Sequence, residues 1–144
     1  MEKQIVNIRE TKSIENGALR MNASTCVAII FAYRNFGIMS HLFHPTEING
    51  HINKINYLLS QKGFDIKDLE CFIAWGNNRS SVYNIWEKNL LAVKENLQKT
   101  TKINQLCTGG DYSRVISLDT QNKLIRVLSS KNQKEPTDEK TINY

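Results

Sequence analysis

Two residues of the chain, Cys26 and His41, are of types that together perform nucleophilic chemistry. A thiol beside an imidazole can lose its proton and become the thiolate nucleophile of acyl-transfer enzymes. Cys26 begins an apolar run that ends at Tyr33, and His41 lies in a second apolar segment, 37–43. The small polar segment 22–25 precedes Cys26, and its backbone N–H groups could stabilise an oxyanion. The sequence therefore offers a nucleophile, a base and an oxyanion loop.

The two apolar segments are expected to form a β-hairpin around Arg34 and Asn35. If the loop has an even number of residues, Ala28 pairs with His41, and Cys26 lies two residues further along on the same face. Diagonal neighbours in a sheet have Cβ atoms about 7 Å apart, within reach of an imidazole and a thiol. An odd loop would place the two residues on opposite faces. From spacing alone, the alternative that Cys26 is a small hydrophobic core residue remains open.

The remaining histidines and cysteines predict neither a metal nor a cofactor. His44 and His51 lie near His41, but no thiol or carboxylate completes a metal-ligand spacing. Cys71 and Cys107 lie in apolar segments and are expected in the core. With three cysteines and no CxxC pair, the sequence predicts a reducing compartment and no disulfide framework.

The composition excludes several classes of protein. The 144 residues, 40% hydrophobic and 23% charged, are enough for one soluble globular domain. The longest apolar run is far shorter than the roughly 20 residues of a membrane-spanning helix, and the first ten residues lack a secretory signal, so we expect a cytoplasmic protein without membrane insertion. The net charge is +5, but the basic residues are scattered. We therefore expect no nucleic-acid partner, whereas an acidic protein partner is compatible with this charge.

Hydrophobic periodicity predicts a mixed α/β (α+β) domain with more strands than helices. Strands are predicted at 4–9, 26–33, 37–43, 69–75, 103–107, 112–118 and 123–128, and helices at 45–62 and 84–99. The strand at 26–33 is apolar on both faces, which implies layers above and below it. The chain from 129 to 144 is polar with a single Ile, so we expect a folded domain at 1–128 and a flexible C-terminal tail at 129–144.

Several segments, in order along the chain, resemble the CheD family of bacterial chemoreceptor glutamine deamidases. The stretch NASTCVAII at 22–30 resembles the segment that carries the family nucleophile, and GIMSHLFHP at 37–45 resembles the strand that carries its histidine. Further matching stretches follow at 63–76, 84–93, 108–115 and 123–126. The ordered set covers nearly the whole predicted domain.

The resemblance implies a single α/β/β/α layered domain, a fold shared with the cytotoxic necrotizing factor toxins. It also implies hydrolysis of a protein glutamine side chain, for example on a chemoreceptor, to glutamate and ammonia without a metal or other cofactor. Cys26 falls on the family nucleophile and His41 on its general base. The third catalytic residue of the family, a threonine six positions before the cysteine, is replaced here by Arg20. Ser24 or Thr25 could substitute for it.

Three functions remain open on the sequence. The first function is an active chemoreceptor deamidase. The second is a non-enzymatic descendant that binds a chemoreceptor or a chemotaxis phosphatase, and the replacement by Arg20 favours this second function. A third possibility is an effector-type deamidase with a different protein target. Release of ammonia separates the first from the second, and identification of the substrate separates the first from the third.

Overall fold

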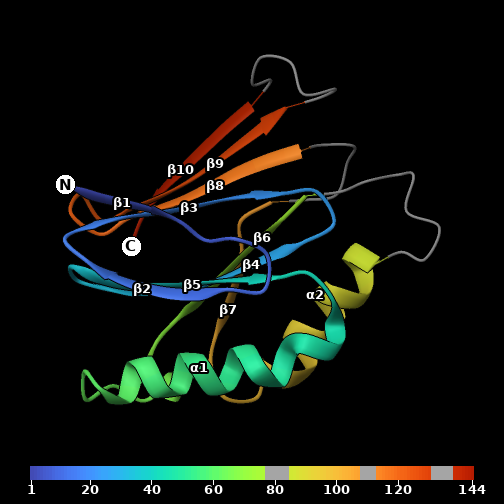
Figure 1. Cartoon of the computed structure of the whole chain (residues 1–144), viewed down its shortest axis with the longest axis horizontal. Coiled ribbons are helices and arrows are strands. Elements are labelled where there is room, and N and C mark those ends of the chain that lie inside the picture. Colours follow the sequence, from blue (N-terminus) through green and yellow to red (C-terminus); the bar gives the residue numbers. More distant parts are fainter. Residues whose placement is uncertain (77–84, 108–112, 131–137) are drawn as a thin grey trace.

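The computed structural model describes residues 1–76, 85–107, 113–130 and 138–144, which form two five-stranded sheets and a helical layer (Figure 1). The first sheet has the strand order β1 (Glu2–Ile5), β3 (Gly17–Ala23), β8 (Ser113–Asp119), β9 (Leu124–Ser130) and β10 (Asp138–Asn143). The second sheet has the order β2 (Thr11–Glu15), β5 (Phe36–Leu42), β4 (Val27–Tyr33), β6 (Cys71–Trp75) and β7 (Ile103–Gln105). Both sheets are mixed, because β1 runs parallel to β3 and β6 runs parallel to β7.

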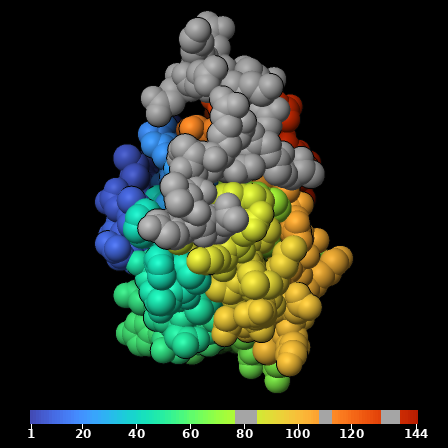
Figure 2. Space-filling model, turned by 90° about the vertical axis from the view of Figure 1, so that its right-hand side faces the viewer, coloured from blue at the N-terminus to red at the C-terminus, as the bar shows by residue number. Residues whose placement is uncertain are grey.

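The two helices, α1 (Ile48–Ser60) and α2 (Ile85–Leu97), pack on one face of the second sheet. Figure 1 shows α1 below that sheet, and Figure 2 shows the start of α1 beside α2. The short 3₁₀ helices Pro45–Glu47 and Ile66–Asp68 lie on either side of α1 in the sequence. No helix in the described ranges has both the length and the apolar content needed to cross a membrane.

The predicted fold class, an α+β domain of mixed sheets with helices, is confirmed. The predicted α/β/β/α layer order is wrong for the described residues, because both helices cover the same sheet and the layers are sheet, sheet and helices. The outer face of the first sheet instead carries exposed polar side chains such as Arg20 and Asn22. These residues alternate along β3 with buried apolar ones, the pattern of a sheet with one solvated face.

Two hydrophobic cores lie on either side of the second sheet. One fills the space between the sheets and includes Leu19, Met21 and Ile30, and the other lies between the second sheet and the helices and includes Phe31 and Leu59. The first five residues of β4 are fully buried because core lies on both of its faces. The prediction that this strand has layers above and below it is therefore confirmed.

The β4–β5 hairpin has the predicted even loop. Tyr33 pairs with Phe36 across the turn at Arg34 and Asn35, and Arg34 has a left-handed backbone with φ of 53°. Ala28 consequently pairs with His41, as the sequence predicts.

The C-terminal segment 129–144 is not simply a tail, and the prediction that it is flexible is wrong for 129–130 and 138–144. Strand β9 continues to Ser130, and β10 pairs antiparallel with β9 along all six of its residues. The Tyr144 hydroxyl donates a hydrogen bond to the Arg34 carbonyl at 2.9 Å. Edge strands are often polar, so a segment with little apolar area can still belong to a sheet. Residues 131–137 lie outside the described ranges.

Candidate active site

Cys26 lies at the end of the second sheet where β4 begins and β5 and β6 finish. Val27, the next residue, pairs with Leu42 on one side and Trp75 on the other. Since Ala28 pairs with His41 and side chains alternate along a strand, Cys26 and His41 are on the face that points to the first sheet. Both are buried, with exposed fractions of 5% and 4%. The predicted same-face placement is confirmed.

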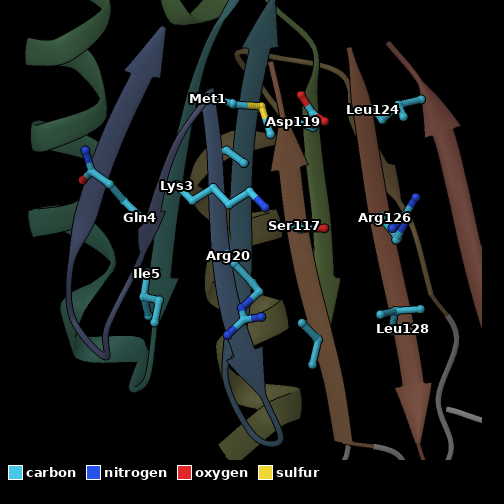
Figure 3. A pocket seen from close by; sticks show the side chains of 12 residues that line it. Met1, Lys3, Gln4, Ile5, Arg20, Ser117, Asp119, Leu124, Arg126 and Leu128 are labelled. Atoms are coloured by element: carbon cyan, nitrogen blue, oxygen red, sulfur yellow. The ribbon is translucent and has the colours of Figure 1, made fainter. Parts of the chain in front are cut away.

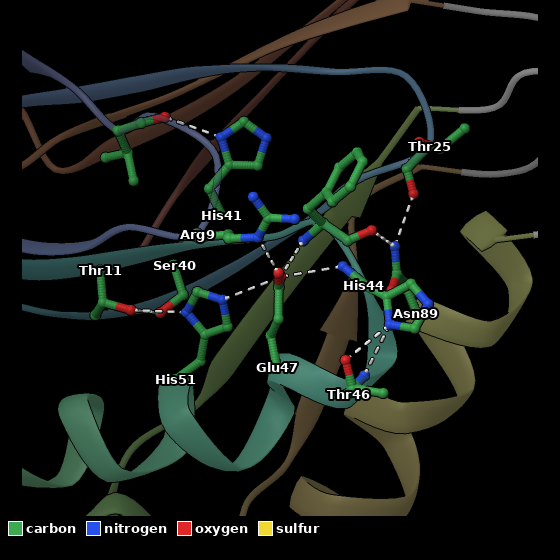
Figure 4. A network of polar contacts seen from close by, with 12 residues as sticks. Arg9, Thr11, Thr25, Ser40, His41, His44, Thr46, Glu47, His51 and Asn89 are labelled. Carbon is green, nitrogen blue, oxygen red and sulfur yellow. Dashed lines mark hydrogen bonds and ion pairs between the residues drawn. The ribbon is translucent and has the colours of Figure 1, made fainter.

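The ring of His41 is held by a backbone carbonyl. Its Nδ1 donates to the carbonyl oxygen of Val6 at 2.9 Å, an interaction drawn in Figure 4. The Val6 N–H in turn donates to the Arg20 carbonyl of β3 at 2.8 Å. Because a carbonyl can only accept, Nδ1 must carry the ring proton, and Nε2 of the neutral ring has a free lone pair. Nε2 is buried without a hydrogen-bond partner in the structure. This is the tautomer that a general base requires.

Burial favours the neutral forms of both residues. It lowers the pKa of His41, against the opposing effects of the Val6 hydrogen bond and of the carboxylates of Glu47 and Glu10. Burial, together with the charge of Glu47, raises the pKa of Cys26 to about 11, against an opposing effect of the Thr25 side chain. At neutral pH the site therefore contains a thiol and a neutral imidazole. The thiolate–imidazolium pair considered from the sequence is therefore not favoured.

Arg20, at the family's third catalytic position, does not join the site. Its neighbours Leu19 and Met21 point into the core between the sheets, so the exposed Arg20 side chain lies on the outer face of the first sheet. The orienting hydrogen bond expected from a side chain at this position comes instead from the Val6 carbonyl. Sequence reasoning missed Val6, because a backbone carbonyl leaves no signal in residue type.

The loop before Cys26 is held by α2. Asn89 is fully buried, and its Nδ2 donates to the carbonyls of Thr25 at 3.0 Å and Phe43 at 2.9 Å. The two carbonyls flank the end of the β4–β5 ladder, and Figure 4 shows Thr25 directly beside Asn89. Thus Asn89 fixes Thr25, the residue before Cys26, relative to the strand that carries His41.

Close backbone packing holds the same loop from the other side. A Cβ atom at Gly76, directly after β6, would collide with the carbonyl oxygens of Ala23 and Ser24. The Ser24 side chain is exposed and lines a surface cavity of about 400 Å³ together with the buried Arg114. Of the two proposed substitutes for the family threonine, Thr25 is half-buried and its side chain lowers the pKa of Cys26, against the larger effect of burial.

The carboxylate of Glu47 fixes the end of β5. Glu47 accepts the N–H groups of Phe43 and His44 at 3.1 Å each, and it forms an ion pair with Arg9 at 2.5 Å (Figure 4). His51 lies on its other side, with Nε2 at 3.9 Å. Glu47 thus orders the chain just after His41, and its negative charge reaches both site residues.

The two other cysteines differ from each other. Cys71 is fully buried in β6 as expected, whereas Cys107 is only half-buried. The Cys107 thiol donates to the Trp75 carbonyl and accepts from the Trp75 N–H, both at 3.2 Å. In the described ranges, no three His, Cys, Asp or Glu side chains are grouped so that they could hold a metal ion.

The chain matches no protein-family model and no curated protein sequence. Residues 108–112, part of one segment that resembles the CheD family, lie outside the described ranges. The resemblance therefore rests on the sequence motifs alone.

Proposed function

We propose that the protein is a cysteine-dependent protein glutamine deamidase of the CheD type. The observation that carries this proposal is the state of His41, whose Nδ1 is anchored by Val6 while Nε2 is left without a partner on the same sheet face as Cys26. An imidazole held in this way can accept the proton of the thiol. The CheD resemblance of the segments around both residues supplies the substrate class.

In the first half of the proposed reaction, the proton of the Cys26 thiol moves to Nε2 of His41 as Sγ attacks the carboxamide carbon of a glutamine side chain. Backbone N–H groups near Cys26 stabilise the oxyanion of the tetrahedral intermediate. The imidazolium then gives its proton to the departing nitrogen, the C–N bond breaks, and ammonia leaves. The product of this half is a thioester between Cys26 and the former glutamine side chain.

In the second half, His41 takes a proton from water, and the resulting hydroxide attacks the thioester carbon. The C–S bond breaks, the proton returns to Sγ, and the products are a glutamate side chain and the original thiol. Burial raises the pKa of Cys26, so the proposed mechanism couples proton transfer to His41 with the attack of Sγ. We further propose that the reaction takes place in the cytoplasm on a chemoreceptor-like protein, with an effector-type target as the alternative.

The test measures the conversion of glutamine to glutamate in candidate protein substrates by peptide mass spectrometry, and it measures the release of ammonia in parallel. Both signals should be lost in Cys26→Ala and in His41→Gln. Cys107→Ala is the matched control, since it removes a half-buried thiol two strands away from His41, and it should keep full activity. Conversion that persists in Cys26→Ala would refute the proposed mechanism.

A specific observation also favours the second candidate, a binding module without catalysis. Burial opposes ionisation of both Cys26 and His41, and the side chain at the family's third position, Arg20, points away from them. A binding module would bind a receptor or a chemotaxis phosphatase with the same affinity in wild type and Cys26→Ala, and neither protein would release ammonia.

A further inference from the structure

The outer face of the first sheet has no helix over it in the described part of the chain, yet it is far from uniformly polar. Between its polar positions it presents Ile5 of β1, Val115 of β8, and Leu124 and Leu128 of β9. Ile5 is 55% exposed, and the other three are half-buried. Apolar side chains gathered in this way on one open face are typical of an interaction surface.

These apolar residues line a groove of about 540 Å³, which we call the outer groove. The strand register places a small residue at its floor, because Ser117 of β8 pairs with Arg20 of β3 on one side and with Arg126 of β9 on the other. Figure 3 shows the small Ser117 between the two long arginine side chains. Two strand spacings separate the arginines at the backbone, about 10 Å, which is also about the diameter of an α-helix.

The outer groove is also positively charged. The side chains of Lys3 and Arg20 have no hydrogen-bond or ion-pair partner among the described residues, and Arg126 forms an exposed ion pair with Glu139 at 3.0 Å. Among the described residues that line the groove, Asp119 is the one acid, and it accepts hydrogen bonds from Asn122. An exposed ion pair contributes at most about 1 kcal/mol, so Arg126 can exchange Glu139 for an acid of a partner.

We propose that the outer groove binds an acidic amphipathic helix of a partner protein. The helix lies along β8 with its apolar stripe on Val115, Leu124 and Leu128, and acidic side chains on its two flanks pair with Arg20 and Arg126. Helix-in-groove recognition uses this combination of an apolar stripe and flanking charges. The inference does not depend on the proposed deamidase activity, because the outer groove lies on the other side of the first sheet from Cys26.

Charge selects this occupant over a second copy of the chain. A face-to-face dimer of two outer grooves would bring Lys3, Arg20 and Arg126 of one copy against those of the other, and like charges at close range are unfavourable. A helix with acidic side chains on both flanks neutralises Arg20 and Arg126 at once.

The test uses a fluorescein-labelled synthetic helix of about 18 residues, long enough to form several turns, with leucines on one stripe and glutamates on both flanks. We expect saturable binding to the wild-type chain in anisotropy titrations and backbone NMR shifts confined to β3, β8 and β9. The double variant Arg20→Glu/Arg126→Glu should weaken binding at least about tenfold. A peptide with lysines in place of the glutamates should show the reverse preference and bind the double variant more tightly than wild type.

The matched control is Lys88→Glu/Lys99→Glu, which changes the net charge equally but on exposed positions in and after α2. This control should bind the acidic peptide as the wild type does. The proposal is overturned if the acidic peptide binds the Arg20→Glu/Arg126→Glu variant as tightly as wild type, or if the shifts lie elsewhere. It is also overturned if this face instead mediates a dimer in sedimentation or binding to phosphatidylglycerol vesicles.

Discussion

Replacing Asn89 with alanine should lower the free energy of unfolding more than is usual for a residue outside the two hydrophobic cores. Asn89 is fully buried in α2, and its amide donates to the carbonyls of Thr25 and Phe43. The substitution removes both hydrogen bonds and leaves two partly buried carbonyls without a donor. At about 1–2 kcal/mol for each, the free energy of unfolding should fall by about 2–4 kcal/mol. For a domain of 144 residues this corresponds to a decrease in Tm of about 6–12 °C.

The matched control is Asn96→Ala in the same helix. Asn96 is exposed, and its side chain bonds only to the Ala92 carbonyl within α2, at 2.7 Å. Both substitutions gain the same helix propensity, so the difference between their melting temperatures isolates the two hydrogen bonds of Asn89 to Thr25 and Phe43. Equal melting temperatures for Asn89→Ala and Asn96→Ala would refute the view that Asn89 clamps the loop.

A second variant, Asn89→Asp, adds a dependence on pH. Ionised aspartate can only accept hydrogen bonds, so at neutral pH a buried negative charge would face two carbonyl oxygens. Burial raises the pKa of such a carboxyl in the folded state above its unfolded value of about 3.9. The variant should therefore gain stability relative to wild type as the pH falls through the folded pKa, because the protonated acid can donate to one carbonyl. A denaturant titration at pH 8 and pH 5 measures this change.

Four further outcomes are expected. Gly76→Ala should cost about 3 kcal/mol in denaturant unfolding, because its Cβ meets the carbonyls of Ala23 and Ser24, whereas Gly50→Ala, in open space on α1, should be neutral or stabilising. Alkylation of Cys26 by iodoacetamide should increase about tenfold per pH unit from pH 7 to pH 10, because its pKa is raised to about 11; a plateau below pH 8 in peptide mapping would contradict this. Removal of residues 138–144 should lower Tm by several degrees through loss of β10, and an unchanged Tm would restore the tail interpretation. Arg20→Thr should not increase glutamine hydrolysis, since this side chain lies on the outer face of the first sheet; a measurable increase would return position 20 to the site.

The geometry around Cys26 and His41 could be predicted because local sequence determines it. Two apolar segments joined by a short turn at Arg34 and Asn35 leave few possible registers, and a slip of one residue would move every buried side chain of β5 to the other face. The clearest helical pattern was likewise found, and α2 runs from Ile85 to Leu97 within the predicted range.

Three strands were missed: β3, although its side chains alternate between buried and exposed, and β2 and β10, which have little apolar area. Strand β2 has a single buried residue, Ile14, and β10 carries Asp138, Glu139 and Lys140 at the open edge of the first sheet. Such strands are recruited by the hydrogen-bonding edge of a neighbour, which exists only once the sheet has formed. Their own residues carry almost no periodic signal.

The third position of the site was misassigned for a different reason. The alternation in β3, with Leu19 and Met21 on one side and Arg20 on the other, was present in the sequence and places Arg20 outside. The family resemblance led to the opposite expectation, because it assigned a catalytic role by position. The anchor that replaces it, the Val6 carbonyl, depends on a contact between segments 35 residues apart and has no residue type to reveal it.

The anchoring of His41 through Val6 has a consequence for how this protein can change over evolutionary time. Every amino acid supplies a carbonyl, so no replacement of the Val6 side chain by another L-residue removes the acceptor itself, and an alanine scan would pass over it. The Val6 N–H is the vulnerable part, because proline lacks it and would release the bond to the Arg20 carbonyl. With the imidazole held by the main chain, the side chain at position 20 on the outer face can change without loss of the hydrogen bond that anchors His41.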